Sequence, residues 1–306
     1  MKRNLALDRF RGMAVILMVV GNSLMDAPDA PGFAQHTQDI GLSFADTVAP
    51  LFLFAIAVSY RQQFTKLYAA FKMKAFMHYA YRYLALIGLG TIFSVGGAVV
   101  SAYTSWGVLQ AIGIAGLLTL LVIPFSTGIR TAAGFGMLVA YQFALDHYFL
   151  QDVLSSPHGG FIGAFSWAAM LILSTVMVDF LQKGMKSFFI GGGVLSIIAV
   201  ISLFIVPISK NRVSLSYVLV STAISCLWYG LVYVFTKLVP QKHGFVSCWG
   251  VDPLLFFVLH LLLLGISRLP FIALQIEPKP LWAAALTSLI MLLILGFIAR
   301  KRYRDA

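Results

Sequence analysis

The sequence predicts an all-α polytopic membrane protein with about ten transmembrane helices and with the N- and C-termini on the cytoplasmic side. The chain has 306 residues, of which 60% are hydrophobic and only 11% are charged, and its mean hydropathy is +0.89. Apolar side chains on this scale need lipid as their solvent. Because one spanning helix takes roughly 20 apolar residues, the chain has room for about ten. Since no polar stretch is long enough for a separate soluble domain, we expect residues 1–306 to form a single transmembrane domain.

The expected helices follow the apolar runs in order. Strong periodicity inside the runs is absent, as expected where the protein core and the lipid are both apolar. Gly88, Gly90 and the three glycines at 191–193 indicate close helix approach rather than ligand loops. The expected ranges are 7–26, 46–62, 76–98, 105–124, 128–147, 160–182, 187–208, 213–237, 250–268 and 281–299.

The basic residues predict the orientation of the chain in the membrane. The formal net charge is +11, but these residues lie in short clusters between apolar runs, which excludes one nucleic-acid-binding face. With both ends cytoplasmic, 18 of the 22 Lys and Arg residues fall on the cytoplasmic side. The other side keeps Lys210, Arg212, Arg268 and Lys279. The N-terminus lacks a small-residue cleavage site at the right distance, so we expect it to be retained.

A polar stretch, FAQHTQDIGLSFADTVAPLF (residues 33–52), joins the first two expected helices and contains no Lys or Arg. His36 lies in this predicted outer loop, and histidine is the side chain best suited to general base catalysis near neutral pH. Asp39 and Asp46 accompany it. Ser43 and Asp46 fit a capping box, and an acidic group also suits the start of a helix. Asp46 is therefore expected to cap the second helix or to act as a partner of His36.

The first helix carries polar residues at both ends, and each group has two possible roles. Asn22, at the outer end, either satisfies its own helical turn or donates to a developing oxyanion. Arg9 and Arg11, at the inner end, either form a basic flank with Asp8 paired locally or bind phosphate, which the arginine fork matches well. Arg82, about one turn into the third expected helix, either adds to such an anion site or anchors its helix.

Farther along, PISKNRVSLSY (residues 207–217) places Lys210 and Arg212 on the outer side, against the charge bias. Such a pair either binds an anionic group or holds the outer vestibule together. Asp252 and His260 lie two turns apart on one helix face, and the reading we favour for His260 is a hydrogen-bonded core histidine.

We expect no metal site. Asp146, His147 and His158 share an outer loop, but their spacing matches no specific metal motif. Two cysteines, Cys226 and Cys248, indicate neither a disulfide framework nor a metal site.

Taken together, these stretches resemble the heparan-α-glucosaminide N-acetyltransferase-like family of transmembrane acyltransferases. LDRFRGMAVILMVVGN resembles the family's opening L-D-x-x-R-G helix with a later Asn. HTQDIGLSFADTVAPLFLF is similar to its segment from the catalytic His through G-L-x-x-A-D. SWGVLQAIGIA, PISKNRVSLSYVL and GVDPLLFFVLH are similar to three later blocks.

The resemblance implies transfer of an acetyl group from cytosolic acetyl-CoA to an extracytoplasmic amino sugar or glycan acceptor. In that reading His36 is catalytic, Asn22 assists it, and Asp46 matches the Asp of the A-D pair. The residues expected to bind acetyl-CoA are Arg9, Arg11, Arg82, Gln110 and Lys210. The residues expected to bind the acceptor are Asp39, Asn211, Ser216, Asp252 and His260.

The sequence departs from the family pattern at two positions. Ala111 stands where the motif has Arg, which removes one candidate phosphate contact, and Asp252 stands in place of Asn. The chain resembles a bacterial member of the family, which implies a multi-pass protein of the bacterial cytoplasmic (inner) membrane. Heparan sulfate is then not the expected natural substrate. The partners implied are acetyl-CoA, the acceptor and the lipid bilayer, and a homodimer is compatible with them.

Two readings from other classes stay open. A transporter or flippase for a sugar or lipid-linked substrate would also use many apolar helices, although the chain shows no internal repeat and no paired broken helices. A non-catalytic membrane partner that has kept the fold would explain the loss of Arg at position 111. Within the acyltransferase reading, the sequence does not choose between direct transfer and an acetyl-histidine intermediate.

Overall fold

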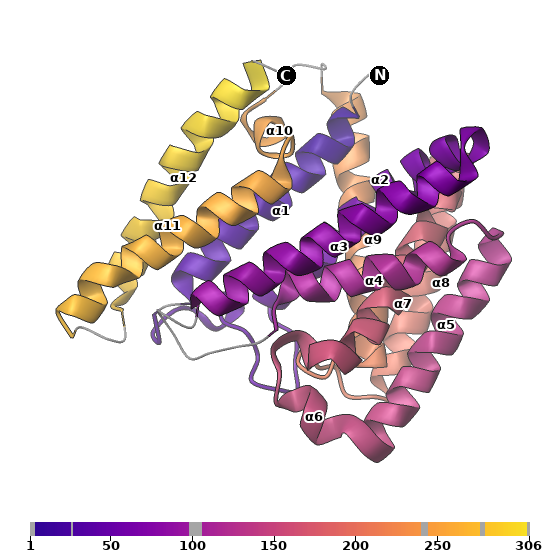
Figure 1. Ribbon diagram of the computed structural model, residues 1–306, viewed down its shortest axis with the longest axis horizontal. Coiled ribbons are helices and arrows are strands. Elements are labelled where there is room, and N and C mark those ends of the chain that lie inside the picture. The colour runs from indigo at the N-terminus through magenta and orange to yellow at the C-terminus, as the bar shows by residue number, and fades with distance from the viewer. Residues whose placement is uncertain (1–3, 26, 98–105, 240–243, 276–278, 305–306) are drawn as a thin grey trace. The chain divides into compact units, whose positions relative to one another are not determined.

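The computed structural model describes residues 4–25, 27–97, 106–239, 244–275 and 279–304 (Figure 1). Within these ranges the regular structure is helical, apart from one isolated parallel β-bridge between Gly41 and Ser209. The all-α prediction is therefore confirmed. Lys2, Arg3 and Lys242, counted above for orientation, lie outside the described residues. The same holds for position 26 at the end of the first expected helix, position 98 at the end of the third and position 105 at the start of the fourth.

Each of the ten expected ranges coincides with one long helix in the described part of the chain. Their bounds are α1 (Leu5–Leu24), α2 (Val48–Ala70), α3 (Lys72–Gly97), α4 (Val108–Val122), α5 (Thr127–Ala144), α7 (Gly160–Lys183), α8 (Met185–Leu203), α9 (Leu215–Leu238), α11 (Pro253–Ala273) and α12 (Leu281–Arg304). Shorter pieces are η1 (Gly32–Ala34), η2 (Ala45–Thr47), η3 (Leu145–Phe149), α6 (Leu150–Leu154), η4 (Pro157–Gly159) and α10 (Phe245–Trp249). Among the described residues, α7, α8, α9, α11 and α12 are long and apolar enough to cross a membrane. The other five spans stay predictions.

The helix boundaries correct the expectation for Arg82. We expected the third helix to begin at residue 76, but α3 begins at Lys72, and α2 continues to Ala70. Arg82 thus lies about three turns into its helix rather than one. The apolar run marks only the part of a helix that suits lipid, whereas the polar residues on either side, rich in Gln, Lys and Ala, are good helix formers that prolong it.

Two compact units make up the chain. The first comprises Met1–His36, Ser43–Phe52 and Trp228–Ala306, and the second comprises Thr37–Leu42 and Leu53–Leu227. In the first unit, Val15 and Val19 of α1 pack in one core with Trp249, Phe256 and Leu295. The backbone of helix α1 directly contacts the backbone of α10 and of Gly250, the residue after it. A Cβ atom on Gly12 would lie 1.9 Å from the carbonyl oxygen of Val246, and a Cβ atom on Gly250 would lie 1.8 Å from the carbonyl oxygen of Asp8.

The second unit is built around α7, since 83% of the residues in its apolar window are buried. Helices α4, α5 and α8 pack on it, and Figure 1 shows α3 running beside α4. Glycine lets these two approach closely, because a Cβ atom on Gly116 would lie 2.2 Å from the Tyr83 ring. Tyr83 in turn lies 5.1 Å from Tyr60, centroid to centroid.

A buried charged cluster ties α2, α5 and α7 together inside the second unit. Asp179 accepts hydrogen bonds from Arg61 Nε at 2.7 Å and from Thr127 Oγ1 at 2.7 Å, and it pairs with Arg130. The Arg130 guanidinium is fully buried and also donates to Thr175 Oγ1 at 2.7 Å. From the sequence, Arg61 and Arg130 are two of the 18 basic residues expected on the cytoplasmic side. The structure gives both a structural role, because a buried arginine needs a carboxylate partner.

Candidate functional site

His36 and Asp46 form a hydrogen-bonded pair in the first unit. His36 Nδ1 lies 2.7 Å from Asp46 Oδ1; the Asp46 side chain is fully buried and the His36 side chain is 35% exposed. The second oxygen of Asp46 accepts from Ser43 N at 2.9 Å and from Ser43 Oγ at 3.0 Å. Asp46 N donates back to Ser43 Oγ at 3.3 Å, so the predicted capping box is present. One oxygen of Asp46 serves the cap and the other holds His36, which joins the two roles that the sequence left as alternatives.

The pair has the geometry of an oriented general base. With Nδ1 donating to an ionised carboxylate, the proton of a neutral imidazole stays on Nδ1 and Nε2 keeps its lone pair. The buried carboxylate also stabilises the imidazolium that forms when Nε2 takes a proton. His36 is partly exposed while Asp46 is not, so the histidine and not the carboxylate is accessible from outside the protein.

A folded loop carries His36. Gln35 Nε2 donates to the Pro28 carbonyl at 2.7 Å and to the Ala30 carbonyl at 2.9 Å, which closes the turns that precede the histidine. Ala27 and Ala30 pack against Ala284 of α12. The loop is therefore fixed by side-chain hydrogen bonds and by a small apolar core.

Asn22 lies in the last turn of α1, half-buried and in the same unit as His36. Both residues are described, and no hydrogen bond joins them. The oxyanion role of Asn22 stays a prediction.

Asp39 and Asn211, predicted to bind the acceptor, make structural contacts in the second unit. Arg212 Nε donates to Asp39 Oδ1 at 2.8 Å and Nη2 contacts the other oxygen, while Ser209 Oγ donates to Oδ1 at 2.9 Å. Asn211 Nδ2 donates to the Gln38 carbonyl. With Gly41 N bonded to the Ile208 carbonyl at 2.8 Å, these contacts fasten residues 37–41 to the loop before α9.

The Asp39–Arg212 pair shifts the pKa values of both side chains. The hydrogen bond from Arg212 holds the pKa of Asp39 below its ordinary value of 3.8, and the same bond raises the pKa of Arg212. Of the two roles left open for Arg212, anion binding and holding the outer loops together, this geometry supports the second.

Lys210 lies inside the same loop, and Ser216 lies in the first turn of α9 that follows it. Lys210 is buried, and Ser216 is fully buried with its Oγ 3.1 Å from Ser214 Oγ. Ser214 Oγ accepts from Ser209 N at 3.0 Å, so Ser216 belongs to the hydrogen-bond network that shapes the loop.

Asp252 and His260 are placed differently from one another in the first unit. Asp252 precedes α11, and its Oδ2 accepts from Arg302 Nη2 of α12 at 2.6 Å with both side chains largely exposed. His260 lies within α11 and is fully buried, as a core histidine would be.

Arg9 lines a groove of about 450 Å³ in the first unit. Its guanidinium carbon lies 5.8 Å from the centroid of the Phe235 ring of α9. Trp228 and Phe245 line the same groove, and the Trp228 Nε1 atom is buried without a hydrogen-bond partner among the described residues. The sequence predicts a role for the arginine but does not indicate the aromatic side chains around it, which come from α9 and α10. Arg11 is half-buried in the same unit.

The remaining predicted donor contacts lie in the second unit. Arg82 is exposed on α3. Gln110 is buried between α3 and α4, where Nε2 donates to Ser94 Oγ at 3.0 Å and a Cβ atom on Gly90 would lie 2.6 Å from Oε1. Ala111, where the family motif has Arg, is fully buried.

No group of three or more His, Cys, Asp or Glu side chains that could hold a metal ion occurs among the described residues. Asp146 accepts from Gln142 Nε2 at 2.8 Å, and His147 Nδ1 pairs with the Phe143 carbonyl at 2.8 Å.

An all-helical chain with apolar helices of spanning length and an oriented histidine–carboxylate pair defines a helical membrane protein with a candidate acid–base site. A family model described as the catalytic region of heparan-alpha-glucosaminide N-acetyltransferase matches residues 3–162, just over half of the chain. The chain belongs to this family of membrane acetyltransferases, which confirms the resemblance seen in the motifs. No curated protein matches the chain. Asn22, His36, Asp46 and Gln110 lie within the matched range.

Proposed function

We propose that this protein moves an acetyl group from cytosolic acetyl-CoA to an amino sugar or glycan on the other side of a bacterial cytoplasmic membrane. The observation that carries the proposal is the 2.7 Å contact between His36 Nδ1 and the buried Asp46 carboxylate. Family membership supplies the reaction class, and the pair supplies the base that the reaction needs.

The chemistry follows from the geometry of the pair. His36 Nε2 takes the proton of the acceptor amine or hydroxyl as that group attacks the thioester carbonyl. The new C–N or C–O bond forms, the C–S bond breaks, and the proton passes from the imidazolium to the departing CoA thiolate. Asp46 stabilises the imidazolium in between. Asn22 donates to the oxyanion, a contact worth roughly 3 kcal/mol in an acyl transfer.

The donor nucleotide is proposed to bind in the Arg9 groove. Arginine binds phosphate oxygens through paired N–H groups, and Arg9 lines the groove. Trp228, Phe235 and Phe245 offer aromatic faces on which an adenine ring can stack. The buried Trp228 N–H is a donor still available to a ligand.

The proposed topology separates the donor's phosphates from the reacting group. With ten spanning helices and both termini cytoplasmic, Arg9 faces the cytosol and His36 faces outward. Helix α1 has 20 residues and is about 30 Å long, close to the thickness of the hydrocarbon core. The pantetheine arm must therefore carry the thioester across the bilayer while the nucleotide stays at the inner surface.

The test is CoA release from acetyl-CoA by the purified protein with a panel of amino sugars and glycans. Wild type is compared with His36→Ala and with His147→Ala, which replaces an exposed histidine outside the pair. We expect the first substitution to lower the rate by about 10²- to 10⁴-fold and the second to leave it unchanged. A wild-type protein that transports a sugar and never consumes acetyl-CoA would refute the proposal in favour of a transporter.

A second experiment separates the two chemical routes. Incubation with acetyl-CoA and no acceptor, followed by mass spectrometry, detects any acetyl group on His36. An acetyl group that forms on His36 and then transfers supports the two-step route. Transfer seen only when donor and acceptor are bound together supports direct attack.

A further inference from the structure

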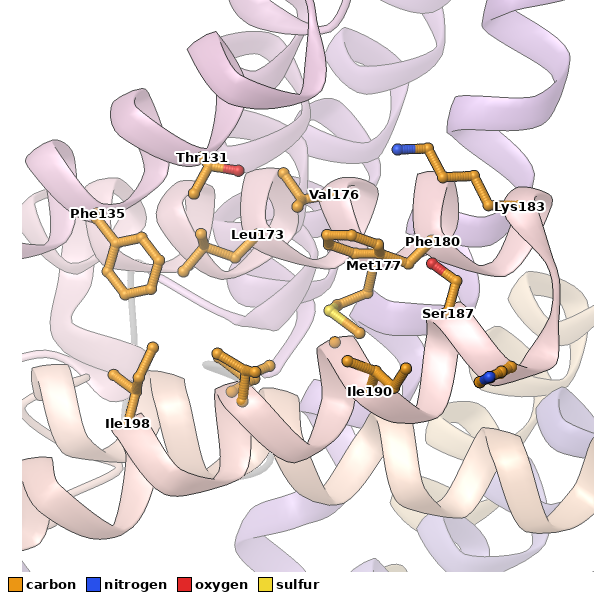
Figure 2. Close-up of a pocket in the computed structure, with 14 residues that line it drawn as sticks. Thr131, Phe135, Leu173, Val176, Met177, Phe180, Lys183, Ser187, Ile190 and Ile198 are labelled. Carbon is orange, nitrogen blue, oxygen red and sulfur yellow. The ribbon is translucent and has the colours of Figure 1, made fainter.

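The second unit contains an apolar groove between α5, α7 and α8 that the acetyl-transfer chemistry does not use. Its volume is about 710 Å³, and it is open along one side. Phe135 of α5, Leu173 and Met177 of α7, and Ile190 and Ile198 of α8 supply much of its wall. Figure 2 shows these side chains facing one another across the groove.

The groove has a polar end and an apolar end. Lys183 and Ser187 lie at one end in Figure 2, and Phe135 and Ile198 lie at the other. Lys186 also lines the groove. Lys183 and Lys186 flank the turn between α7 and α8, both are exposed, and neither forms an ion pair within the described chain.

The start of α8 adds to the positive potential at the lysine end. Gly184 precedes the helix, and no side chain caps it, so the first backbone N–H groups of α8 have no side-chain acceptor. A helix of 19 residues carries a partial positive charge at this end. Two lysines and an uncapped helix start thus coincide at one end of an apolar groove.

The dimensions match one leaflet of a bilayer. From Lys186 to Ile198 the groove follows α8 for roughly 18 Å at the rise of an α-helix. One leaflet's share of the hydrocarbon core is about 15 Å. A molecule with a negatively charged head at the lysines and one acyl chain along α8 would fill this space.

We propose that the groove binds a single anionic phospholipid, with its phosphate at Lys183 and Lys186 and one acyl chain against the α7 and α8 side chains. Charge complementarity selects an anionic over a zwitterionic lipid, because each lysine near a membrane surface favours anionic lipid by about fivefold. Two lysines give a preference of about thirtyfold. This site does not depend on acetyl transfer.

The test uses phosphatidylglycerol with a photoreactive group in one acyl chain, bound to the full-length protein in detergent and mapped by mass spectrometry. Unlabelled phosphatidylglycerol and phosphatidylcholine compete for the site. We expect labelling on α7 and α8 and about thirtyfold better competition by phosphatidylglycerol. The double variant K183Q/K186Q should abolish that preference, whereas K72Q/K74Q, which removes two exposed lysines at the start of α3, should keep it.

A second pair of variants tests the acyl half of the site. Val194 lines the groove and Val200 lies on the same helix outside it, and each is 54% exposed. Val194→Trp should reduce labelling at least tenfold, and Val200→Trp should not. Three results would each overturn the proposal. They are labelling outside α5, α7 and α8, equal loss in both lysine double variants, and displacement of the lipid by acetyl-CoA as readily as by phosphatidylglycerol.

Discussion

Replacing Asp46 by asparagine removes the negative charge beside His36 and leaves the shape of the side chain almost unchanged. The amide oxygen of the new side chain can still accept from Ser43, so the cap survives. The amide N–H₂ then faces His36 Nδ1, which becomes an acceptor, and the imidazole proton moves to Nε2. The nitrogen that faces the acceptor loses its lone pair and can no longer act as a base.

The magnitude follows from the burial of the carboxylate. A hydrogen bond to a charged group contributes about 1.5–3 kcal/mol, which is roughly 10- to 150-fold in rate when it forms only in the transition state. Reversal of the tautomer in serine-protease triads costs up to about 10⁴-fold. Because the Asp46 side chain is fully buried and 2.7 Å from Nδ1, we expect Asp46→Asn to lower kcat by about 10²- to 10⁴-fold.

The assay is CoA release at saturating acetyl-CoA, with the KM for acetyl-CoA and the thermal stability measured on the same samples. The KM should stay within a few-fold, since the proposed donor groove lies at Arg9. Ser43→Ala is the matched control: it weakens the cap by about 1 kcal/mol yet keeps the carboxylate, so its activity should fall only a few-fold.

Full activity in Asp46→Asn would refute the role of Asp46. So would an activity loss in Ser43→Ala as large as that in Asp46→Asn, because the cap and not the charge would then matter. A double variant with His36→Ala should be no worse than His36→Ala alone, since the two side chains act as one unit.

Three further predictions concern the stability of the fold outside the His36–Asp46 pair. Asp179→Asn leaves two arginines in the buried cluster without their carboxylate and should destabilise the protein by about 3–5 kcal/mol, seen as a lower Tm in detergent. Gly250→Ala places a Cβ atom 1.8 Å from a backbone oxygen and should lower the Tm sharply, whereas Gly265→Ala, with nothing within 4 Å, should not. Because Arg212 lowers the pKa of Asp39 below 3.8, the ion pair stabilises the fold above pH 3.8, and this stabilisation is lost as the pH falls through the lowered pKa. Arg212→Gln should therefore make the Tm fall less steeply below about pH 4. An unchanged dependence of Tm on pH would contradict this.

Local sequence sufficed for the helices and for the pair at the candidate site. A spanning helix is recognised from its own apolar length, so all ten expected ranges coincide with helices in the described chain. His36 and Asp46 are ten residues apart, and Ser43 fixes Asp46 through a three-residue capping pattern. Contacts between residues that are close together in the sequence can be recognised from a local motif.

Contacts between distant segments could not be read in this way. The distribution of basic residues predicts that Arg130 lies on the cytoplasmic side. It does not reveal that Arg130 is paired with a carboxylate 49 residues away in α7. Asp39 pairs with Arg212 at a separation of 173 residues, and this pair links two loops that the sequence does not connect. Its contact with the acceptor stays a prediction. Nothing in either segment alone indicates the other.

The sequence by itself determined that the chain is a membrane protein, where its helices lie and which family it belongs to, and it indicated His36 as a candidate base. Each of these follows from the length of apolar runs or from a short motif. Tertiary structure alone decided which charges are buried and paired, which aromatic rings surround Arg9, and that an apolar groove ends at Lys183 and Lys186. These features depend on which helix faces pack together. When both lipid and protein core are apolar, hydrophobic pattern does not distinguish those faces.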